Sequence, residues 1–262
     1  MELTAGQMMA RDGTTYPRSE TFLKGRLRHA MTSREMAELE EILSDEQDVP
    51  AGTIVLEAGK LYDKSMLLTE GMMLRTIDTD HQQRIVGLQV PGDFVDLHSF
   101  ALKRLDHNIQ AVGECRVVYG RHDDLKAAID GNSHLARILW FATLLDAAIH
   151  RQWILKTKQL RADACAAHFF AETWARLELV GMARNDGFNS SLTQSHIAEF
   201  CGTTPVHMSR VLRTIRERGL GEFRRGRFYC NDRKGLEEFG RFDPGYLYGD
   251  DSLGIGDELT PE

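Results

Sequence analysis

The residues best suited to chemistry in this sequence are arginines gathered near the C-terminus. Residues 203–234 hold nine Lys and Arg against only three acidic residues, and four of the arginines lie in the run 205-PVHMSRVLRTIRERG-219. A guanidinium group binds phosphate and can also donate two parallel hydrogen bonds to guanine O6 and N7. The segment is therefore suited to a polyanion, with a solvated helix face as the alternative.

The arginines need a helix to position them, and the local sequence predicts one from Pro205 to near Gly219. Proline is tolerated at the first helical position, where its missing N–H would have no partner anyway. Thr204 just before it is a good N-cap residue. The apolar positions of this helix are Val206, Met208, Val211, Leu212 and Ile215.

A second, shorter helix precedes it and predicts a helix-turn-helix. Thr193 caps a helix through Phe200, and Gly202 permits the backbone that turns the corner. The residues expected to fill the angle between the two helices are Ile197, Ala198, Gly202, Met208 and Val211. These offsets favour a DNA-reading motif over an ordinary helical hairpin.

The first turn of the second helix in such a motif enters the major groove. We expect Val206, His207 and Arg210 to reach base edges, because Pro205 cannot donate a hydrogen bond. After Gly219, the string EFRRGRFY predicts two short strands around Gly226. The residues expected to hold phosphates without reading sequence are Thr193, Thr204, Arg213, Arg225 and Arg227.

Two further zones precede the motif. Residues 49–124 alternate turn residues with short β-leaning runs (TIVLEA, MLLTEG, MLRTID, RIVGLQV, IQAVG, RVVYG), which predicts an antiparallel sandwich or barrel. A capping box, Thr32 with Glu35, opens a short helix through about Leu43 ahead of it. Residues 132–180 contain no glycine or proline and predict helix, with a bend around residues 157–161.

The long helix carries a regular apolar row. Leu135, Ile138, Ala142, Leu145 and Ile149 follow alternating steps of three and four residues, the spacing of a coiled-coil seam. This spacing favours a homodimer contact, and packing against the helix's own domain is the alternative.

Composition narrows the function classes. No apolar run approaches the ~20 residues needed to cross a bilayer, and Met1 to Thr21 lack a secretory h-region. The cysteines at 115, 165, 201 and 230 show no C-x-x-C spacing, so we expect no metal and a reducing, cytoplasmic setting. No nucleophile–base motif, phosphate loop or metal-ligand spacing suggests an enzyme.

The sequence resembles the Crp/Fnr transcription regulators over roughly residues 30 to 236. The resemblance rests on VPAGTIVLEAG, MLLTEGMMLR, VPGDFV and HRQWIL, and above all on SLTQSHIAEFCGTTPVHMSRVLRTIRERGL. It implies an α+β fold with an antiparallel cyclic-nucleotide-binding-like β-roll or jelly roll, a long dimerisation helix and a C-terminal winged helix-turn-helix. It also implies a homodimer on a palindromic double-stranded operator and contact with RNA polymerase.

The domain boundaries expected from this resemblance are an N-terminal extension 1–29, a β-roll domain 30–130, a dimerisation helix 131–158, a DNA-binding domain 159–236 and an acidic tail 237–262. The family's base-reading positions map to Pro205, Val206 and Arg210. The first two are arginine and glutamate in cAMP-responsive members, so we expect a different half-site.

The expected effector pocket departs from the family pattern. After Gly92-Asp93-Phe94, residues Asp96, Leu97 and His98 replace the Gly-Glu-Leu segment, and residues near Asp106-His107-Asn108 replace the phosphate-binding Arg-Ser pair. No arginine is placed to bind a phosphate there, which argues against the binding of cAMP. An N-terminal iron–sulfur cluster is excluded by the lack of cysteine before Cys115, whereas haem stays open through His81, His98, His107 or His122.

The sequence leaves an alternative function and the state of the acidic tail to be decided. One alternative function is a ligand-binding signalling module that lacks sequence-specific DNA binding. The tail from Phe239, with eight acidic residues against Arg241 over residues 237–262, is expected to be mobile or weakly docked.

Overall fold

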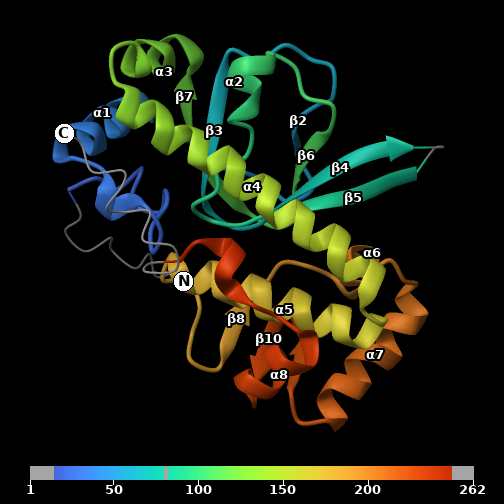
Figure 1. Ribbon diagram of the computed structural model, residues 1–262. Coiled ribbons are helices and arrows are strands. Elements are labelled where there is room, and N and C mark those ends of the chain that lie inside the picture. Colours follow the sequence, from blue (N-terminus) through green and yellow to red (C-terminus); the bar gives the residue numbers. More distant parts are fainter. Residues whose placement is uncertain (1–14, 80–81, 250–262) are drawn as a thin grey trace, which may run out of the picture.

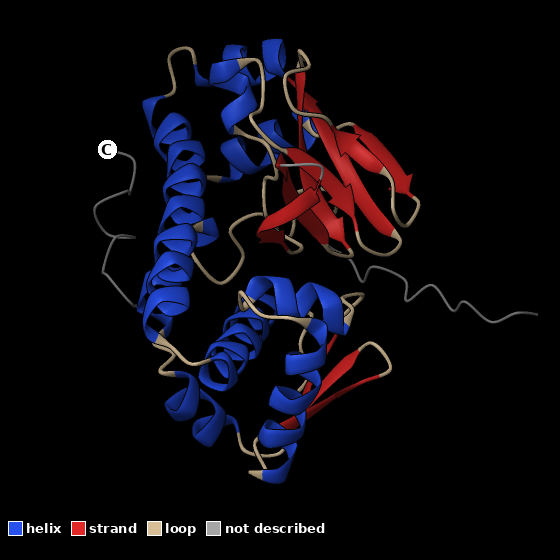
Figure 2. Ribbon diagram, turned by 90° about the vertical axis from the view of Figure 1, so that its right-hand side faces the viewer, coloured by secondary structure: helices blue, strands red, loops and turns tan. Residues whose placement is uncertain are grey.

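The computed structural model describes residues 15–79 and 82–249 of the 262-residue chain. Figure 1 shows two units joined by α4 (Ser133–Gln159), which runs diagonally across the upper unit and reaches the lower one near α6. Turned by 90°, Figure 2 shows the strands of the upper unit on one side, α4 along the other, and a mainly helical lower unit beneath. This arrangement confirms the expected α+β class.

The upper unit contains two antiparallel sheets with a shared apolar core. One sheet has the order β1 (Asp45–Val49), β7 (Cys115–Arg121), β3 (Lys64–Glu70), and the other β2 (Ile54–Leu56), β6 (Asn108–Ala111), β4 (Met73–Thr79), β5 (Gln82–Gln89). Both sheets bury side chains in one cluster, such as Met66 and Val117 from the first and Met73 and Ile109 from the second. All six predicted β-leaning runs form strands. The unpredicted β1 has four exposed residues and lies at a sheet edge, where acidic side chains are tolerated.

Short helices surround these sheets. They are η1 (Arg28–Ala30), α1 (Ser33–Ile42), α2 (His98–Leu102) and α3 (His122–Ile129). The predicted capping box is present, since the Thr32 hydroxyl accepts from the backbone N–H of Glu35 and the Glu35 carboxylate accepts from that of Thr32. The same carboxylate lies 2.7 Å from His134 Nδ1 and so ties α1 to the start of α4.

The long helical zone breaks where the sequence predicts. Helix α4 ends at Gln159, and α5 (Ala162–Leu179) begins after the two connecting residues Leu160 and Arg161. Helix α5 is buried along most of its length and forms the centre of the lower unit.

The structure corrects the expected dimer seam. Leu135, Ile138, Leu145 and Ile149 are buried within the chain itself, and Ala142 is partly buried against the same core. Elements of the same chain, including α3 and the C-terminal turn η2 (Pro244–Leu247), contact α4. The apolar row therefore anchors α4 to its own protomer and is not free for a second copy.

The lower unit contains the predicted helix, tight turn, helix and hairpin. Its remaining elements are β8 (Gly187–Asn189), α6 (Gln194–Phe200), α7 (Pro205–Glu217), β9 (Gly221–Arg224), β10 (Arg227–Cys230) and α8 (Arg233–Gly240), with the sheet order β8-β10-β9.

The expectation of a mobile or weakly docked tail from Phe239 is wrong for residues 239–249. Helix α8 continues to Gly240, and Phe242 and Leu247 are buried in the main core. Residues 250–262 lie outside the described part of the chain.

Candidate nucleic-acid interface

Threonine caps begin both helices of the helix-turn-helix. The Thr193 hydroxyl accepts from the backbone N–H of His196 and the Thr204 hydroxyl from that of His207, each at 3.2 Å. Pro205 occupies the start of α7. The exposed first turn of the 13-residue α7 therefore has a fixed geometry and the partial positive charge of a helix N-terminus.

The turn between the helices requires glycine for its backbone. Gly202 has φ +60°, and a Cβ at this position would meet nothing within 4 Å, so conformation rather than space demands the glycine. The backbone N–H of Thr203 then donates to the carbonyl of Ala198 at 2.9 Å. Ile197, Ala198, Met208 and Val211 are all buried between or beneath the helices.

One face of α7 is left open to solvent. Val206 is 72% exposed and shares an open groove with Ser209, Arg210 and Arg213, which follow at helical spacing. His207 is also exposed, in the first turn. This face has the apolar, hydroxyl and guanidinium groups needed to contact base edges and phosphates.

Sequence reasoning missed two residues of this groove. Ser209 lies three residues after Val206, so helical periodicity could have identified it. Gln194 Nε2 donates to the carbonyl of Pro205 at 2.9 Å and thereby joins the first turns of α6 and α7. No sequence signal marks that contact, because the turn brings the two residues together.

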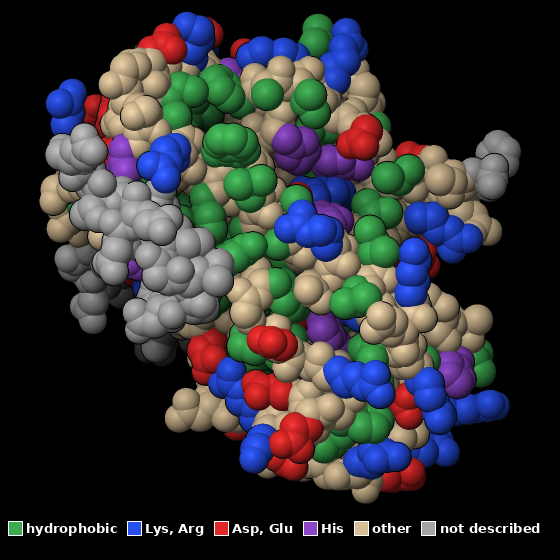
Figure 3. Space-filling view, in the orientation of Figure 1, with side chains coloured by type: hydrophobic (Ala, Val, Ile, Leu, Met, Phe, Trp, Pro, Cys, Tyr) green, Lys and Arg blue, Asp and Glu red, His purple; other side chains and the backbone are tan. Residues whose placement is uncertain are grey.

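The arginines of α7 have different environments. Within the described residues, neither Arg210 nor Arg213 has an ion-pair partner, whereas Arg216 lies 3.8 Å from Glu222. Arg218 stacks on the Phe239 ring at 4.7 Å. In Figure 3, Lys and Arg side chains gather over α7 at the lower right. Arg210 and Arg213 are therefore the two arginines of this helix that are available to a polyanion.

The hairpin arginines also differ from each other. Arg225 is exposed at the tip, where its φ of +48° precedes Gly226 in the turn. Arg227 Nη2 lies 2.6 Å from Asp186 Oδ1, and its side chain is only 15% exposed. Arg227 thus holds the hairpin to the turn before β8, and Arg225 is the better placed of the two for an external phosphate.

The expected effector residues do not form one cluster. Asp96 points into the core, where Oδ1 accepts from the backbone N–H of Met66 at 2.7 Å and Oδ2 from the Ser99 hydroxyl at 3.1 Å. Burial raises the pKa of Asp96 to about 7. Leu97 is also buried. An inward-facing carboxylate of this kind cannot hold a ribose hydroxyl in a pocket.

Two histidines do come together beside the long helix. The rings of His98 and His107 are 5.2 Å apart, and the second pairs through Nδ1 with Asp106 at 2.7 Å. Burial, followed by the neighbouring charge of Arg75, lowers the pKa of His98 to about 4. Burial and the charge of Arg75 lower the pKa of His107 as well. Both imidazoles are therefore neutral at ordinary pH and offer no fixed positive charge to an anion.

Arg75, which sequence reasoning missed, is the buried cation next to these histidines. It extends from β4 to α4, where Nη1 lies 2.9 Å from Asp146 Oδ2, and Nη2 donates to the carbonyl of Val95 at 3.3 Å. Its charge is neutralised by a carboxylate of the same chain. Arg75 is thus not free to bind a cyclic phosphate between the β-unit and α4.

The described residues contain neither a metal-binding cluster nor a membrane-spanning helix. Among them, no group of three or more His, Cys, Asp or Glu could hold a metal ion, and His81 lies outside them. None of their helices combines the length and hydrophobicity of a membrane span.

Comparison with known proteins supports the motif and the fold. Residues 167–239 match the model of the Crp-like helix-turn-helix domain, and no curated protein matches the sequence. FixK2 from Bradyrhizobium japonicum has a similar structure, with a TM-score of 0.66 and 17% identity over 74% of this chain and 96% of that one. CLP from Xanthomonas campestris, described as a c-di-GMP responsive global regulator, gives a TM-score of 0.58 and 13% identity over 77% of this chain and 100% of that one. A CRP-family transcriptional regulator from Thermus thermophilus gives a TM-score of 0.59 and 18% identity over 74% of this chain and 96% of that one.

Proposed function

Because residues 167–239 form a Crp-like helix-turn-helix domain, carried on the fold of the Crp/Fnr regulators, we propose that this protein is a homodimeric transcription regulator that binds a palindromic operator. The observation that carries the proposal is the open face of α7. Val206, Arg210 and Arg213 are exposed there beside the capped first turn, and the two guanidinium groups have no ion-pair partner in the described residues.

A different face of α4 from the one expected supports the dimer. Trp140 is 65% exposed and Leu144 50% exposed, and Ile154 is exposed further along. The full row is Arg137, Trp140, Leu144, Ala147, Arg151, Ile154 and Lys158, again in alternating steps of three and four. Exposed hydrophobic side chains follow the course of α4 in Figure 3. We assign this row as the dimer seam, because it has coiled-coil spacing and because the described part of the chain leaves all of its residues except Ala147 exposed.

The β-unit then serves as a regulatory domain that does not use cAMP. Asp96 faces the core, His98 and His107 are neutral, and Arg75 is paired with Asp146. A cyclic phosphate buried beside these described residues would find no unpaired cation among them, which makes its desolvation costly.

Selection of bound duplexes from a random DNA pool, with and without cell extract, tests this function. A palindrome with half-site centres about 10 bp apart is expected, because two α7 helices related by two-fold symmetry must enter successive major grooves. Enrichment only in the presence of extract would show that a small molecule is required. If no sequence were enriched under either condition, the proposal would fail.

A further inference from the structure

The C-terminal residues 241–249, here named the C-terminal clamp, follow a defined path over the long helices. Arg241 ends α8 and Tyr248 ends η2, each with a left-handed backbone conformation, φ +49° and +50°. The Asp243 carboxylate accepts from the backbone N–H of Gly245 at 2.9 Å and caps η2. Ahead of the clamp, Gly240 lies so close to α5 that a Cβ would come within 2.5 Å of the backbone nitrogen of His168.

The clamp contacts a fully buried carboxylate, that of Glu172 in α5. From α4, the Trp153 indole donates to Glu172 Oε1 at 2.7 Å, and Lys156 Nζ lies 4.0 Å from Oε2. From α5 itself, Arg176 Nη1 lies 3.8 Å from Oε1. Burial opposes ionisation, but the two cations and the hydrogen bonds lower the pKa of Glu172, so it is a carboxylate at neutral pH. An anion in this position holds α4 and α5 together.

The clamp supplies the third element of this junction. The hydroxyl of Tyr246 donates to Glu172 Oε2 at 2.6 Å, and the Tyr246 ring stacks parallel to His168 with centroids 6.5 Å apart. Phe242 meets the His168 ring edge-on at 5.4 Å. Burial, followed by the charge of Glu172, raises the pKa of Tyr246, so the phenol keeps the proton that it donates.

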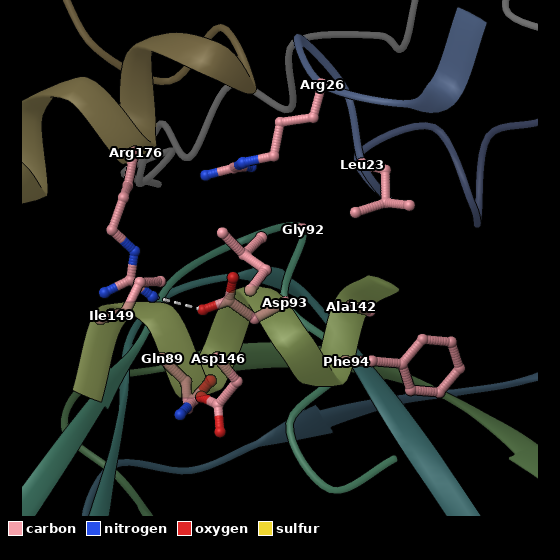
Figure 4. A pocket seen from close by; sticks show the side chains of 11 residues that line it. Leu23, Arg26, Gln89, Gly92, Asp93, Phe94, Ala142, Asp146, Ile149 and Arg176 are labelled. Carbon is pink, nitrogen blue, oxygen red and sulfur yellow. Dashed lines mark hydrogen bonds and ion pairs between the residues drawn. The ribbon is translucent and has the colours of Figure 1, made fainter. Parts of the chain in front are cut away.

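Two further contacts extend the clamp beyond Glu172. Arg26 Nε of the N-terminal segment donates to the carbonyl of Leu247 at 2.9 Å, and the Tyr248 ring meets Phe141 of α4 edge-on at 5.5 Å. In Figure 4, Arg26 extends from the N-terminal segment towards Arg176 of α5, whose Nη2 lies 2.6 Å from Asp93. The clamp thus joins the N-terminal segment, α4 and α5.

The cavity in Figure 4 is not itself a ligand site. It encloses about 20 Å³, room for one or two water molecules. Of the arginines that line it, Arg176 forms an ion pair with Asp93.

We propose that the C-terminal clamp fixes the angle between α4 and the DNA-binding unit. Only Leu160 and Arg161 connect α4 to α5. The polar junction at Glu172 bridges this connection, and Tyr246 closes the junction from the side of the clamp. Without Tyr246 the carboxylate loses a charge-assisted hydrogen bond and the ring that covers it, and the two helices can separate locally. The proposal does not depend on DNA binding, and its test needs no DNA.

Hydrogen exchange measured by mass spectrometry on the full-length protein tests this proposal. Tyr246→Phe keeps the ring and removes only the hydroxyl, and a chain ending at Arg241 removes every clamp residue after that one. Tyr119→Phe, in β7 of the β-unit, is the matched control, and a chain ending at Gly249 controls for the residues beyond the clamp. Trypsin cleavage after Arg161 reports on the joint independently.

For both clamp variants, we expect exchange at residues 168–176 and cleavage after Arg161 to rise on the order of tenfold, with the larger effect in the shortened chain. Amides of β3 and β7 should keep their parent rates. Parent-like protection of residues 168–176 in the chain ending at Arg241 would overturn the proposal. Faster exchange in β3 and β7 as well would also overturn it, because the segment would then stabilise the whole fold and not the joint.

Discussion

Leu144 and Leu145 are neighbours in the chain, yet they point in directions about 100° apart around α4: Leu144 is 50% exposed and Leu145 only 5%. Leu145 belongs to the row that anchors the helix to its own protomer. Leu144 belongs to the exposed row assigned to the dimer. The same substitution at the two positions therefore separates folding from association.

We expect Leu144→Asp to give a folded monomer and Leu145→Asp to give a misfolded or strongly destabilised chain. Aspartate at 144 places charges face to face at the seam, whereas aspartate at 145 buries a charge without a partner, at a cost of several kcal/mol. Sedimentation measures the association state, and circular dichroism with thermal melting measures folding. A Leu144→Asp protein that still sediments as a dimer would move the interface away from this row.

Arg213→Ala should weaken binding to every duplex to a similar degree. Arg213 is exposed on α7 without an ion pair in the described residues, so we expect it to neutralise a phosphate. Titrations at several salt concentrations should show the slope of log K against log salt falling by about one. Arg218→Ala is the matched control, since that guanidinium stacks on Phe239, and its slope should stay near that of the parent.

The buried Asp96 predicts a pH dependence of stability. Its folded pKa of about 7 exceeds the ordinary value of 3.8, so the folded state binds the proton more tightly than the unfolded state does. The stability it contributes is complete below about pH 4, falls as the pH rises towards 7, and is lost above that, a change on the order of 4 kcal/mol. Urea unfolding across this range measures it.

Asp96→Asn should flatten that profile, because the amide keeps an acceptor for Met66 N–H and does not titrate. Asp123→Asn, at an exposed carboxylate, should leave the profile unchanged. An Asp96→Asn protein that lost stability with pH as steeply as the parent would show that other groups cause the loss.

Two glycine-to-alanine changes should differ in size for a structural reason. Gly202→Ala meets no atom but must adopt φ +60°, so we expect a cost of about 1 kcal/mol. At Gly240, by contrast, the new Cβ would meet the backbone of His168, which cannot move as a flexible side chain can. Thermal melting should rank Gly240→Ala as clearly more destabilising, and equal melting temperatures would contradict this account.

The long helix shows where sequence reasoning succeeds and where it stops. The absence of glycine and proline over residues 132–180 correctly predicts helix. Periodicity, however, finds two rows with the same spacing, Leu135 to Ile149 and Arg137 to Lys158. The more apolar row is the one its own chain buries, because a protomer first covers its most hydrophobic surface. Only the three-dimensional packing reveals which row is left for a partner.

The C-terminal segment was missed for a related reason. Acidic and glycine residues after Phe239 suggest a loose tail, but Phe242, Tyr246 and Leu247 at intervals of one to four residues are enough to dock it. The partner of Tyr246 is Glu172, 74 residues earlier. Such a long-range polar pair leaves no local pattern in the sequence. The caps, the turn glycine and the apolar positions of the helix-turn-helix are all local and could be predicted, whereas the contact of Gln194 with Pro205 could not.

The most direct measurement is a titration of the parent and Arg210→Ala against the selected operator and its single-base variants. If α7 reads bases, Arg210→Ala should lose roughly 1–3 kcal/mol on the selected operator and no longer discriminate at one symmetric position in each half-site, while discrimination elsewhere is kept. Undiminished discrimination at every position by Arg210→Ala would contradict the assignment of this helix face as the reader of the sequence.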